Sequence, residues 1–218
     1  MLGNEYIYAI AKEEMLKVVE TFERNLGSVV VNPHHLDDSV KWLEIAAKHP
    51  RIVYLTINLE STYQLYSSPG WLRLFAEIAV RKLAILWNTG GQDLNRRDPQ
   101  AALHGHLWEI RGAAREKVEI FRRVDEFFPD TPVILGHGYG LEGLELAKKC
   151  KNFYPGLCTS YPEQNAYRRS VVMVGAEQVV FDADLEMISP AFVLGSVWGT
   201  DLDEHEHRMI MIGGFNLF

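Results

Sequence analysis

Apolar residues recur at intervals of three and four along residues 5–24, which is the spacing of one face of an amphipathic helix. Gly27 ends this pattern, and the β-branched run at 28–31 that follows is bounded by Asn32 and Pro33. Such a short apolar run between turn residues is typical of a fully buried parallel strand. The chain therefore starts with a predicted helix followed by a predicted strand.

Helix and strand patterns continue to alternate along the rest of the chain. The sequence predicts strands at 28–31, 52–59, 83–87, 133–136, 153–157 and 179–181. It predicts helices at 5–24, 37–49, 71–80, about 113–128 and 141–149, a helix that ends at 171–175, and a terminal helix that carries 201–206. Alternation of this kind indicates an α/β fold with a mostly parallel sheet.

The number of repeating units bears on which α/β architecture is present. About six strand–helix units fit the chain, whereas a closed TIM barrel has eight and takes about 250 residues. An open doubly wound sheet also suits this alternation, but no glycine-rich phosphate loop follows a first strand. We therefore expect an incomplete or distorted TIM-barrel-like (β/α) fold, with residues 1–218 in a single domain.

Composition narrows the class of partner. The 218 residues are 47% hydrophobic and 23% charged, which is ordinary for a globular protein with one sizeable core. A formal net charge of -7 argues against nucleic acid or an anionic membrane surface, because both need clustered Lys and Arg. No apolar run approaches the roughly 20 residues that span a bilayer. The expected partner is a small molecule or another protein.

Cysteine usage and the start of the chain indicate the compartment. Cys150 and Cys158 are too few for a disulfide framework and too irregularly placed for a zinc ribbon. Residues 1–30 lack a basic region followed by an apolar signal core. We expect a cytoplasmic protein.

Three strings carry candidate chemistry. Residues 133–140 (VILGHGYG) place His137 after an expected strand, 179–184 (VVFDAD) end on Asp184, and 212–218 (IGGFNLF) close the chain. Together they resemble the C-terminal half of the amidohydrolase-related (amidohydrolase 2, ACMSD-like) metal-dependent hydrolases and decarboxylases. The similarity extends along nearly the whole chain.

This resemblance implies a barrel with His137 at the end of the sixth strand and Asp184 at the end of the eighth, both facing the mouth. It also implies zinc or another divalent metal, with Asp184 as a ligand that accepts a proton from water. His137 would bind a second metal or polarise the substrate. The residues alone leave alternatives: His137 hydrogen-bonds a neighbouring strand end, or Asp184 caps a helix or loop.

The chain departs from the family pattern at three places. No His-x-His strand occurs near Met1, Asn88 stands where the family has a metal-binding histidine, and Asn58 stands where it often has a lysine. His137 and Asp184 alone do not make a tight zinc site, since three protein ligands and water are the usual catalytic minimum. A metal-free protein is therefore an alternative.

Further site residues are expected at or beside the strand ends. Four are assigned to substrate binding, namely Asn58, Asn88, Trp87 and Tyr139. His104 and His106 have the spacing of a metal pair, and His34 follows an expected strand, so all three are candidates for extra ligands. The alternative is a loop that folds over the barrel mouth for His104 and His106, and a polar loop for His34.

A second group of histidines has no assigned chemistry. His205 lies in the acidic run 201–206 and His207 directly follows it, a pattern that predicts a solvent-exposed face of the terminal helix.

Two functions of different class follow. The first is a shortened, divergent hydrolase or decarboxylase that acts on a small carboxylate, lactone or ester through His137 and Asp184. The alternative is a metal-free, inactive relative that serves as a binding or assembly subunit. Because two barrel units are missing, unpaired strand edges are expected, and a homodimer or larger homo-oligomer would cover them.

Overall fold

The computed structural model describes residues 2–58, 68–81, 83–88, 125–126, 129–136, 141–157, 165–183 and 189–213. Its five strands run parallel in one open sheet, in the order β1-β2-β3-β4-β5. The chain divides into two compact units, Met1–Leu86 and Trp87–Phe218, and the boundary between them falls within β3.

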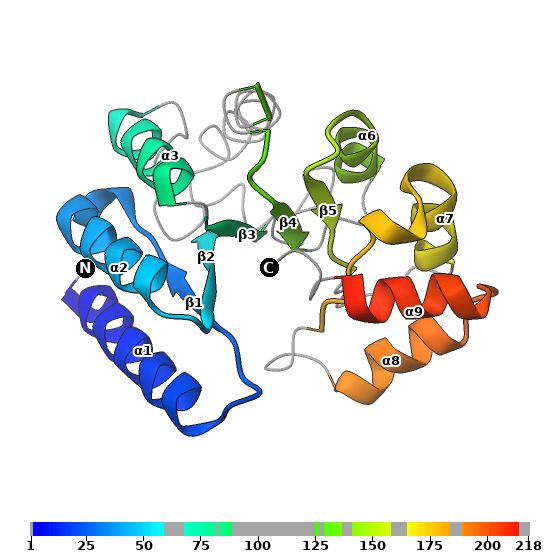
Figure 1. Cartoon of the computed structure of the whole chain (residues 1–218), viewed down its shortest axis with the longest axis horizontal. Helices are drawn as coiled ribbons and strands as arrows, with labels where there is room; N and C mark the ends of the chain where they lie inside the picture. The colour runs from blue at the N-terminus through cyan, green and yellow to red at the C-terminus, as the bar shows by residue number, and fades with distance from the viewer. Residues whose placement is uncertain are drawn as a thin grey trace, which may run out of the picture. The chain divides into compact units, whose positions relative to one another are not determined.

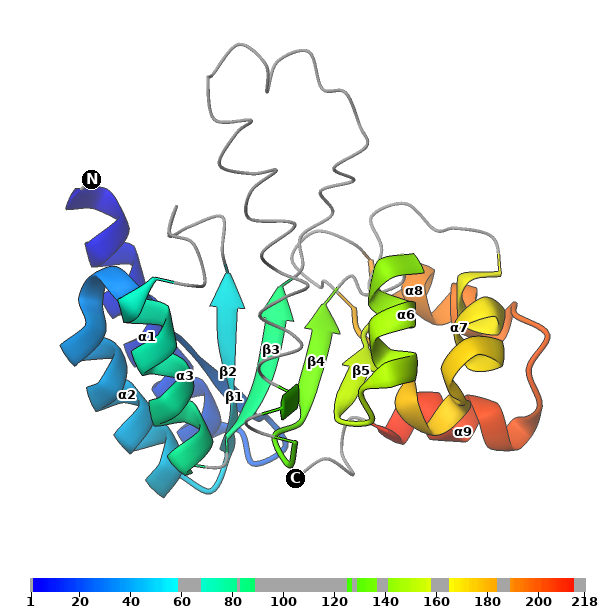
Figure 2. The same ribbon diagram turned by 90° about the horizontal axis from the view of Figure 1, so that it is seen from above.

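The first unit alternates helix and strand from its start. Its elements are α1 (Leu2–Thr21), β1 (Gly27–Val30), the short 3-10 helix η1 (Pro33–His35), α2 (Leu36–Lys48), β2 (Ile52–Asn58), α3 (Pro69–Arg81) and β3 (Ala84–Asn88). Helix α2 packs on β1, β2 and α3, and α1 packs on β1. Figures 1 and 2 show the three helices on the same side of these strands.

Apolar side chains hold the helices to the strands of the first unit. Strand β1 pairs with β2 in parallel, with Val29 opposite Leu55, and both side chains are completely buried. From α2, Leu43 and Ala46 are buried at positions three residues apart, so one stripe of the helix faces the core. Gly27 leaves room for α1, because a Cβ there would lie 3.0 Å from Cγ1 of Val19.

The second unit continues the alternation. Its elements are β4 (Val133–Gly136), α6 (Leu141–Lys149), β5 (Phe153–Pro155), α7 (Ala166–Val174), the 3-10 helix η2 (Ala176–Gln178), α8 (Pro190–Trp198) and α9 (Glu204–Gly213). Strand β4 pairs with β5 in parallel, with Leu135 opposite Pro155. Helix α6 packs on β5 and on α7, while α9 packs on η2.

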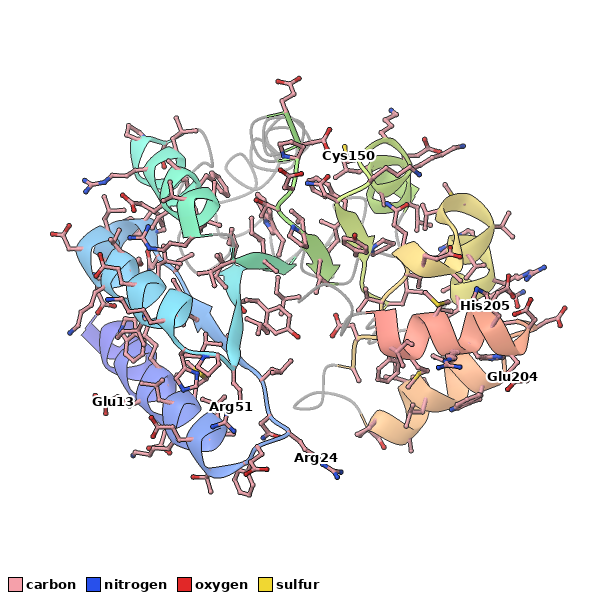
Figure 3. All side chains as sticks on the ribbon, in the orientation of Figure 1. Glu13, Arg24, Arg51, Cys150, Glu204 and His205 are labelled. Atoms are coloured by element: carbon pink, nitrogen blue, oxygen red, sulfur yellow. The ribbon has the colours of Figure 1, made fainter. Side chains whose placement is uncertain are left out.

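A buried cluster joins the C-terminal helices of this unit. Its members come from β5 and its end, α7, η2, α8 and α9: Leu157, Tyr167, Val171, Ala176, Val179, Val197 and Ile210. Gln178 ties η2 to α6, because its Nε2 donates to the carbonyl oxygens of Ala147 (2.7 Å) and Phe153 (2.9 Å). Cys150, at the end of α6, is labelled in Figure 3.

Most predicted elements are confirmed. The predicted helix at 141–149 and the strand at 133–136 have the observed bounds, and the helices and strands of the first unit differ from prediction by three residues or fewer at each end. The predicted helix at 113–128 lies largely outside the described residues. The single-domain assignment stays a prediction.

The predicted strand at 179–181 is wrong in extent. Only Val180 forms a β-bridge, in parallel with Gly156. The next amide, of Phe181, donates instead to the carbonyl of Ile210 on α9 at 3.1 Å. Packing of α9 therefore ends the pairing after one residue, and the described residues contain five named strands rather than six.

Within the part of the chain that the structure describes, no helix is both long enough and apolar enough to cross a bilayer.

Candidate active site

Two candidate residues end strands, and a third directly follows one in the sequence. Asn58 is the last residue of β2, Asn88 is the last residue of β3, and His137 directly follows Gly136, which ends β4. The side chains of Asn58 and Asn88 lie outside the described structure, as do His137, Tyr139 and Asp184 in full. Strand ends of this kind carry the active sites of parallel α/β folds.

Within the second unit, backbone hydrogen bonds fix which strand ends are neighbours. The Gly156 amide donates to the Leu135 carbonyl at 2.9 Å, and the Val180 amide donates to the Pro155 carbonyl at 3.0 Å. The chain that leads to His137 and the chain that leads to Asp184 therefore leave from the same edge, with β5 between them. Neighbouring strands lie about 4.8 Å apart, so roughly 10 Å separates the two departure points.

A carboxylate already occupies this edge. Asp182 lies over the backbone of Gly156, where an added Cβ would be 3.0 Å from Asp182 Oδ2 and 3.2 Å from the Leu135 carbonyl oxygen. Glycine at position 156 thus creates the space that holds the Asp182 side chain at the end of β5. Asp182 is half-buried there.

In the sequence, Asp182 is an extra carboxylate two residues before Asp184, and the contact between it and Gly156 was not predicted. The contact joins residues that are far apart in the chain, and no periodic pattern reports it. The lone glycine at 156, in the apolar segment 153–157, was the available signal, because such a glycine often marks a close backbone approach.

Trp87 and Tyr154 are two of the aromatic residues on the described strands. Trp87 on β3 is completely buried, and its contact with a substrate stays a prediction. Tyr154 on β5 is partly buried, and loss of hydration raises the pKa of its phenol above that of a free tyrosine. The phenol therefore stays neutral at physiological pH, able to donate a hydrogen bond.

The candidate metal ligands lie in different places. His34 is exposed on η1, where its backbone amide is bonded to Oδ1 of Asn32 at 2.9 Å. His104 and His106 lie outside the described residues. Among the residues that are described, no three His, Cys, Asp or Glu side chains come together as a metal site.

One histidine differs from expectation. His205 is 69% exposed, as predicted for a solvent-facing helix position, and lies at the start of α9 beside Glu204 (Figure 3). His207 is half-buried instead, with its ring stacked on that of Trp198 at 5.0 Å between centroids. The acidic run predicted exposure correctly for one residue of the pair, but packing against α8 overrides it for the other.

Comparison with known proteins bears on the architecture. No family model and no curated protein matches the chain. Among solved structures, the 5-carboxyvanillate decarboxylase LigW from Sphingomonas paucimobilis matches with a TM-score of 0.74 and 18% identity, over 98% of this chain and 72% of that one. The chain shares its fold.

Two further solved structures match the fold of this chain. A dihydroxybenzoic acid decarboxylase from Polaromonas sp. JS666, with bound manganese and the inhibitor 2-nitroresorcinol, gives a TM-score of 0.69 and 14% identity, over 96% of this chain and 74% of that one. A structure described as amidohydrolase II matches with a TM-score of 0.66 and 15% identity, over 97% of this chain and 76% of that one. The predicted likeness to the amidohydrolase 2 decarboxylases is thus confirmed at the level of fold, and the open five-stranded sheet fits an incomplete form of that barrel.

Proposed function

We propose that this chain is a divergent decarboxylase of a small aromatic carboxylate that acts through His137 and Asp184. The observation that carries the proposal is the shared edge formed by Leu135, Gly156 and Val180, from which the two candidate residues follow. The names of the matched decarboxylases supply the substrate class. Hydrolysis of a lactone or ester is the related reaction that the same pair of side chains would support.

The reaction needs a proton at one carbon. Cleavage of the bond between an aromatic ring and its carboxylate releases carbon dioxide, and the electron pair of that bond returns to the ring. The ring carbon must gain a proton for this to occur. We assign that proton to the carboxyl group of Asp184, which is then reprotonated from water, and we assign to His137 a hydrogen bond that orients the substrate.

The assigned metal ligands suit a divalent cation. Asp184 would provide a carboxylate and His137 an imidazole, donors that manganese and zinc both accept. The matched dihydroxybenzoic acid decarboxylase contains manganese, which makes manganese the first metal to test. A bound cation would supply attraction for the substrate carboxylate and charge stabilisation during bond cleavage.

Product analysis tests this function. The purified chain, supplied with manganese, is incubated with hydroxylated benzoates and with lactone and ester panels, and loss of carboxylate is followed by chromatography and carbon dioxide release. We expect turnover of at least one hydroxylated benzoate. Asp184→Asn and His137→Ala should each lower kcat/KM by about a hundredfold or more.

The control is His205→Ala, which removes an exposed imidazole of α9 and should leave turnover unchanged. Equal activity in the wild type, Asp184→Asn and His137→Ala would contradict the proposed roles.

A second function has its own support. Asn58 and Asn88 are amides at strand ends where the related enzymes carry a lysine and a metal-binding histidine, which favours a metal-free binding or assembly subunit. Elemental analysis after dialysis discriminates the two. Stoichiometric metal that is lost in Asp184→Asn supports the enzyme, whereas no metal and no turnover on any panel supports the subunit.

A further inference from the structure

Helix α8 carries an apolar face that is open to solvent. The helix contains no charged side chain, and its buried side, which carries Val193 and Val197, packs into the second unit beside α9 (Figure 1). Phe192 is 46% and Trp198 is 62% exposed. Together with the other exposed positions they form what we call the α8 face: Ala191, Phe192, Gly195, Trp198 and Gly199. Exposed apolar side chains that gather on one face mark an interaction surface.

We infer that the α8 face pairs with the same face of a second copy of this chain, with the two helices antiparallel about a two-fold axis beside Gly195. At about 3.6 residues per turn, the α8 face is centred on Gly195. Phe192 comes three residues before this glycine and Trp198 three residues after it. In the antiparallel pair, Phe192 of each copy is therefore level with Trp198 of the other. A two-fold interface requires self-complementarity of this kind.

The centre of the α8 face suits close approach of two helices. A Cβ added at Gly195 would meet nothing within 4 Å, so the space above this position is open. Ala191 and Gly199, four residues to either side of it, are small as well. Two helix backbones can therefore approach closely at Gly195, where the aromatic rings of Phe192 and Trp198 would cover the crossing from both sides.

The distribution of charge favours a second copy as the occupant. The chain has a formal net charge of -7, so many of its surfaces would repel a second copy. The α8 face brings no charged side chains of its own together. In the antiparallel arrangement, the exposed carboxylate of Asp201, which follows α8, approaches the N-terminal end of the other α8, where partial positive charge attracts it. The N-cap Ser189 leaves that end without a side-chain cap.

The small size of the α8 face predicts a transient pair. A helix of nine residues is only about 14 Å long, whereas a stable interface covers about 800 Å² on each partner. The face also belongs to the second unit, while β1, which ends the strand order, belongs to the first. A test therefore has to trap contacts at α8 itself rather than measure total assembly.

Thiol crosslinking of Gly195→Cys traps such contacts. The full chain that carries this substitution is oxidised over a concentration series, and covalent dimer is measured by non-reducing electrophoresis and located by mass spectrometry. Val172→Cys is the control, because Val172 is 72% exposed on α7 and lies outside the α8 face. We expect the disulfide between two copies to form about tenfold or more faster for Gly195→Cys, since the axis brings these positions together. Equal rates would overturn the inference and leave a different protein as the occupant of the face.

Charge substitutions test the antiparallel register. Phe192→Glu and Trp198→Lys are each added to Gly195→Cys, and both suit α8 itself, because an acid near its start and a base near its end match the helix dipole. Each alone should slow crosslinking by about tenfold, since it places an unpaired charge in the apolar contact. The double variant should regain part of this loss at low salt, through two Glu–Lys pairs across the axis. Crosslinking in the double variant that is no faster than in either single variant would contradict the register.

Discussion

Gly156 and Asp182 form the contact that connects the sheet to the candidate site. The carboxylate of Asp182 lies against the backbone of Gly156, and Asp184 follows two residues later. A methyl group at position 156 would meet both the Asp182 side chain and the Leu135 carbonyl, and the backbone oxygen has little freedom to move. The geometry of the segment after Val180 therefore depends on this glycine.

Gly156→Ala should shift Asp182 and the segment that leads to Asp184. We expect a loss of turnover of about tenfold or more, with a cost in stability of about 1–3 kcal/mol from overpacking. Gly195→Ala is the matched control, because a Cβ at Gly195 on α8 meets nothing within 4 Å. Turnover that is equal in Gly156→Ala and Gly195→Ala would show that the Asp182 contact does not position the site.

Tyr154 predicts a dependence of stability on alkaline pH. Burial raises the pKa of its phenol, so the unfolded chain loses this proton before the folded chain does. The contribution of Tyr154 to stability is therefore complete below about pH 10 and declines as the pH rises further. Urea unfolding of the wild type and Tyr154→Phe at neutral and alkaline pH measures it. The difference between the two proteins should change only at alkaline pH; a constant difference at every pH would argue against this assignment.

At the scale of elements, Lys12 links the first two helices. Its side chain is 6% exposed, its Nζ lies 2.6 Å from Asp38 Oδ2, and the same nitrogen lies 5.5 Å from the centre of the Trp42 ring. A lysine that is buried in this way contributes through its packed stem as well as its charge. The contact ties α1 to α2 across the sequence.

Lys12→Ala should lower the free energy of unfolding by about 1–3 kcal/mol. The control on the same helix is Lys17→Ala, which breaks an exposed ion pair with Glu14 and should cost less than about 0.5 kcal/mol. Urea denaturation followed by circular dichroism compares them. An equal effect of the two substitutions would mean that the Lys12 contacts add nothing to an ordinary surface pair.

Periodicity in the sequence predicted most elements because their apolar faces are regular. In α2 one stripe of the helix is buried, and in β2 Leu55 and Ile57 are buried two positions apart; these patterns depend on neighbours in the chain. The prediction of a strand at 179–181 was wrong because the Phe181 amide donates to the Ile210 carbonyl on α9, which is distant in sequence. The half-buried state of His207 was missed for the same reason, since Trp198 on α8 covers it.

For the candidate site, the sequence predicted positions better than contacts. It placed Asn58 and Asn88 at strand ends, where the described backbone has them, and it placed His137 after the strand that ends at Gly136. The position of Asp182 over Gly156 depends on the β-bridge between Gly156 and Val180. These residues are distant in the sequence, so the local hydrophobic pattern does not predict the contact. Substrate contacts by Trp87 and Tyr139 stay predictions.

At the scale of the whole molecule, β1 ends the strand order with β2 as its one neighbour in the described sheet. An unpaired edge of this kind favours pairing with another chain. The adjacent end of α1 exposes apolar side chains, with Phe22 57% and Val18 40% accessible. These features support our proposal of a homodimer or larger homo-oligomer.

Light scattering coupled to size exclusion measures that assembly directly. We expect at least twice the 24.9 kDa mass of one chain at micromolar concentration. Phe22→Glu should shift the protein toward the monomer, because it places a charge in the apolar surface. Val80→Glu is the control, since Val80 is an exposed residue of α3. A wild-type monomer at this concentration would count against the proposal.

The proposed chemistry requires His137 and Asp184 to face one cavity. A crystal structure of the full chain grown with manganese, with anomalous scattering recorded at the manganese edge, tests this directly. We predict that the imidazole and the carboxylate point into the same cavity at the carboxyl ends of β4 and β5, with the metal signal beside Asp184. Side chains directed to opposite faces of the sheet, or either one buried far from any cavity, would contradict it.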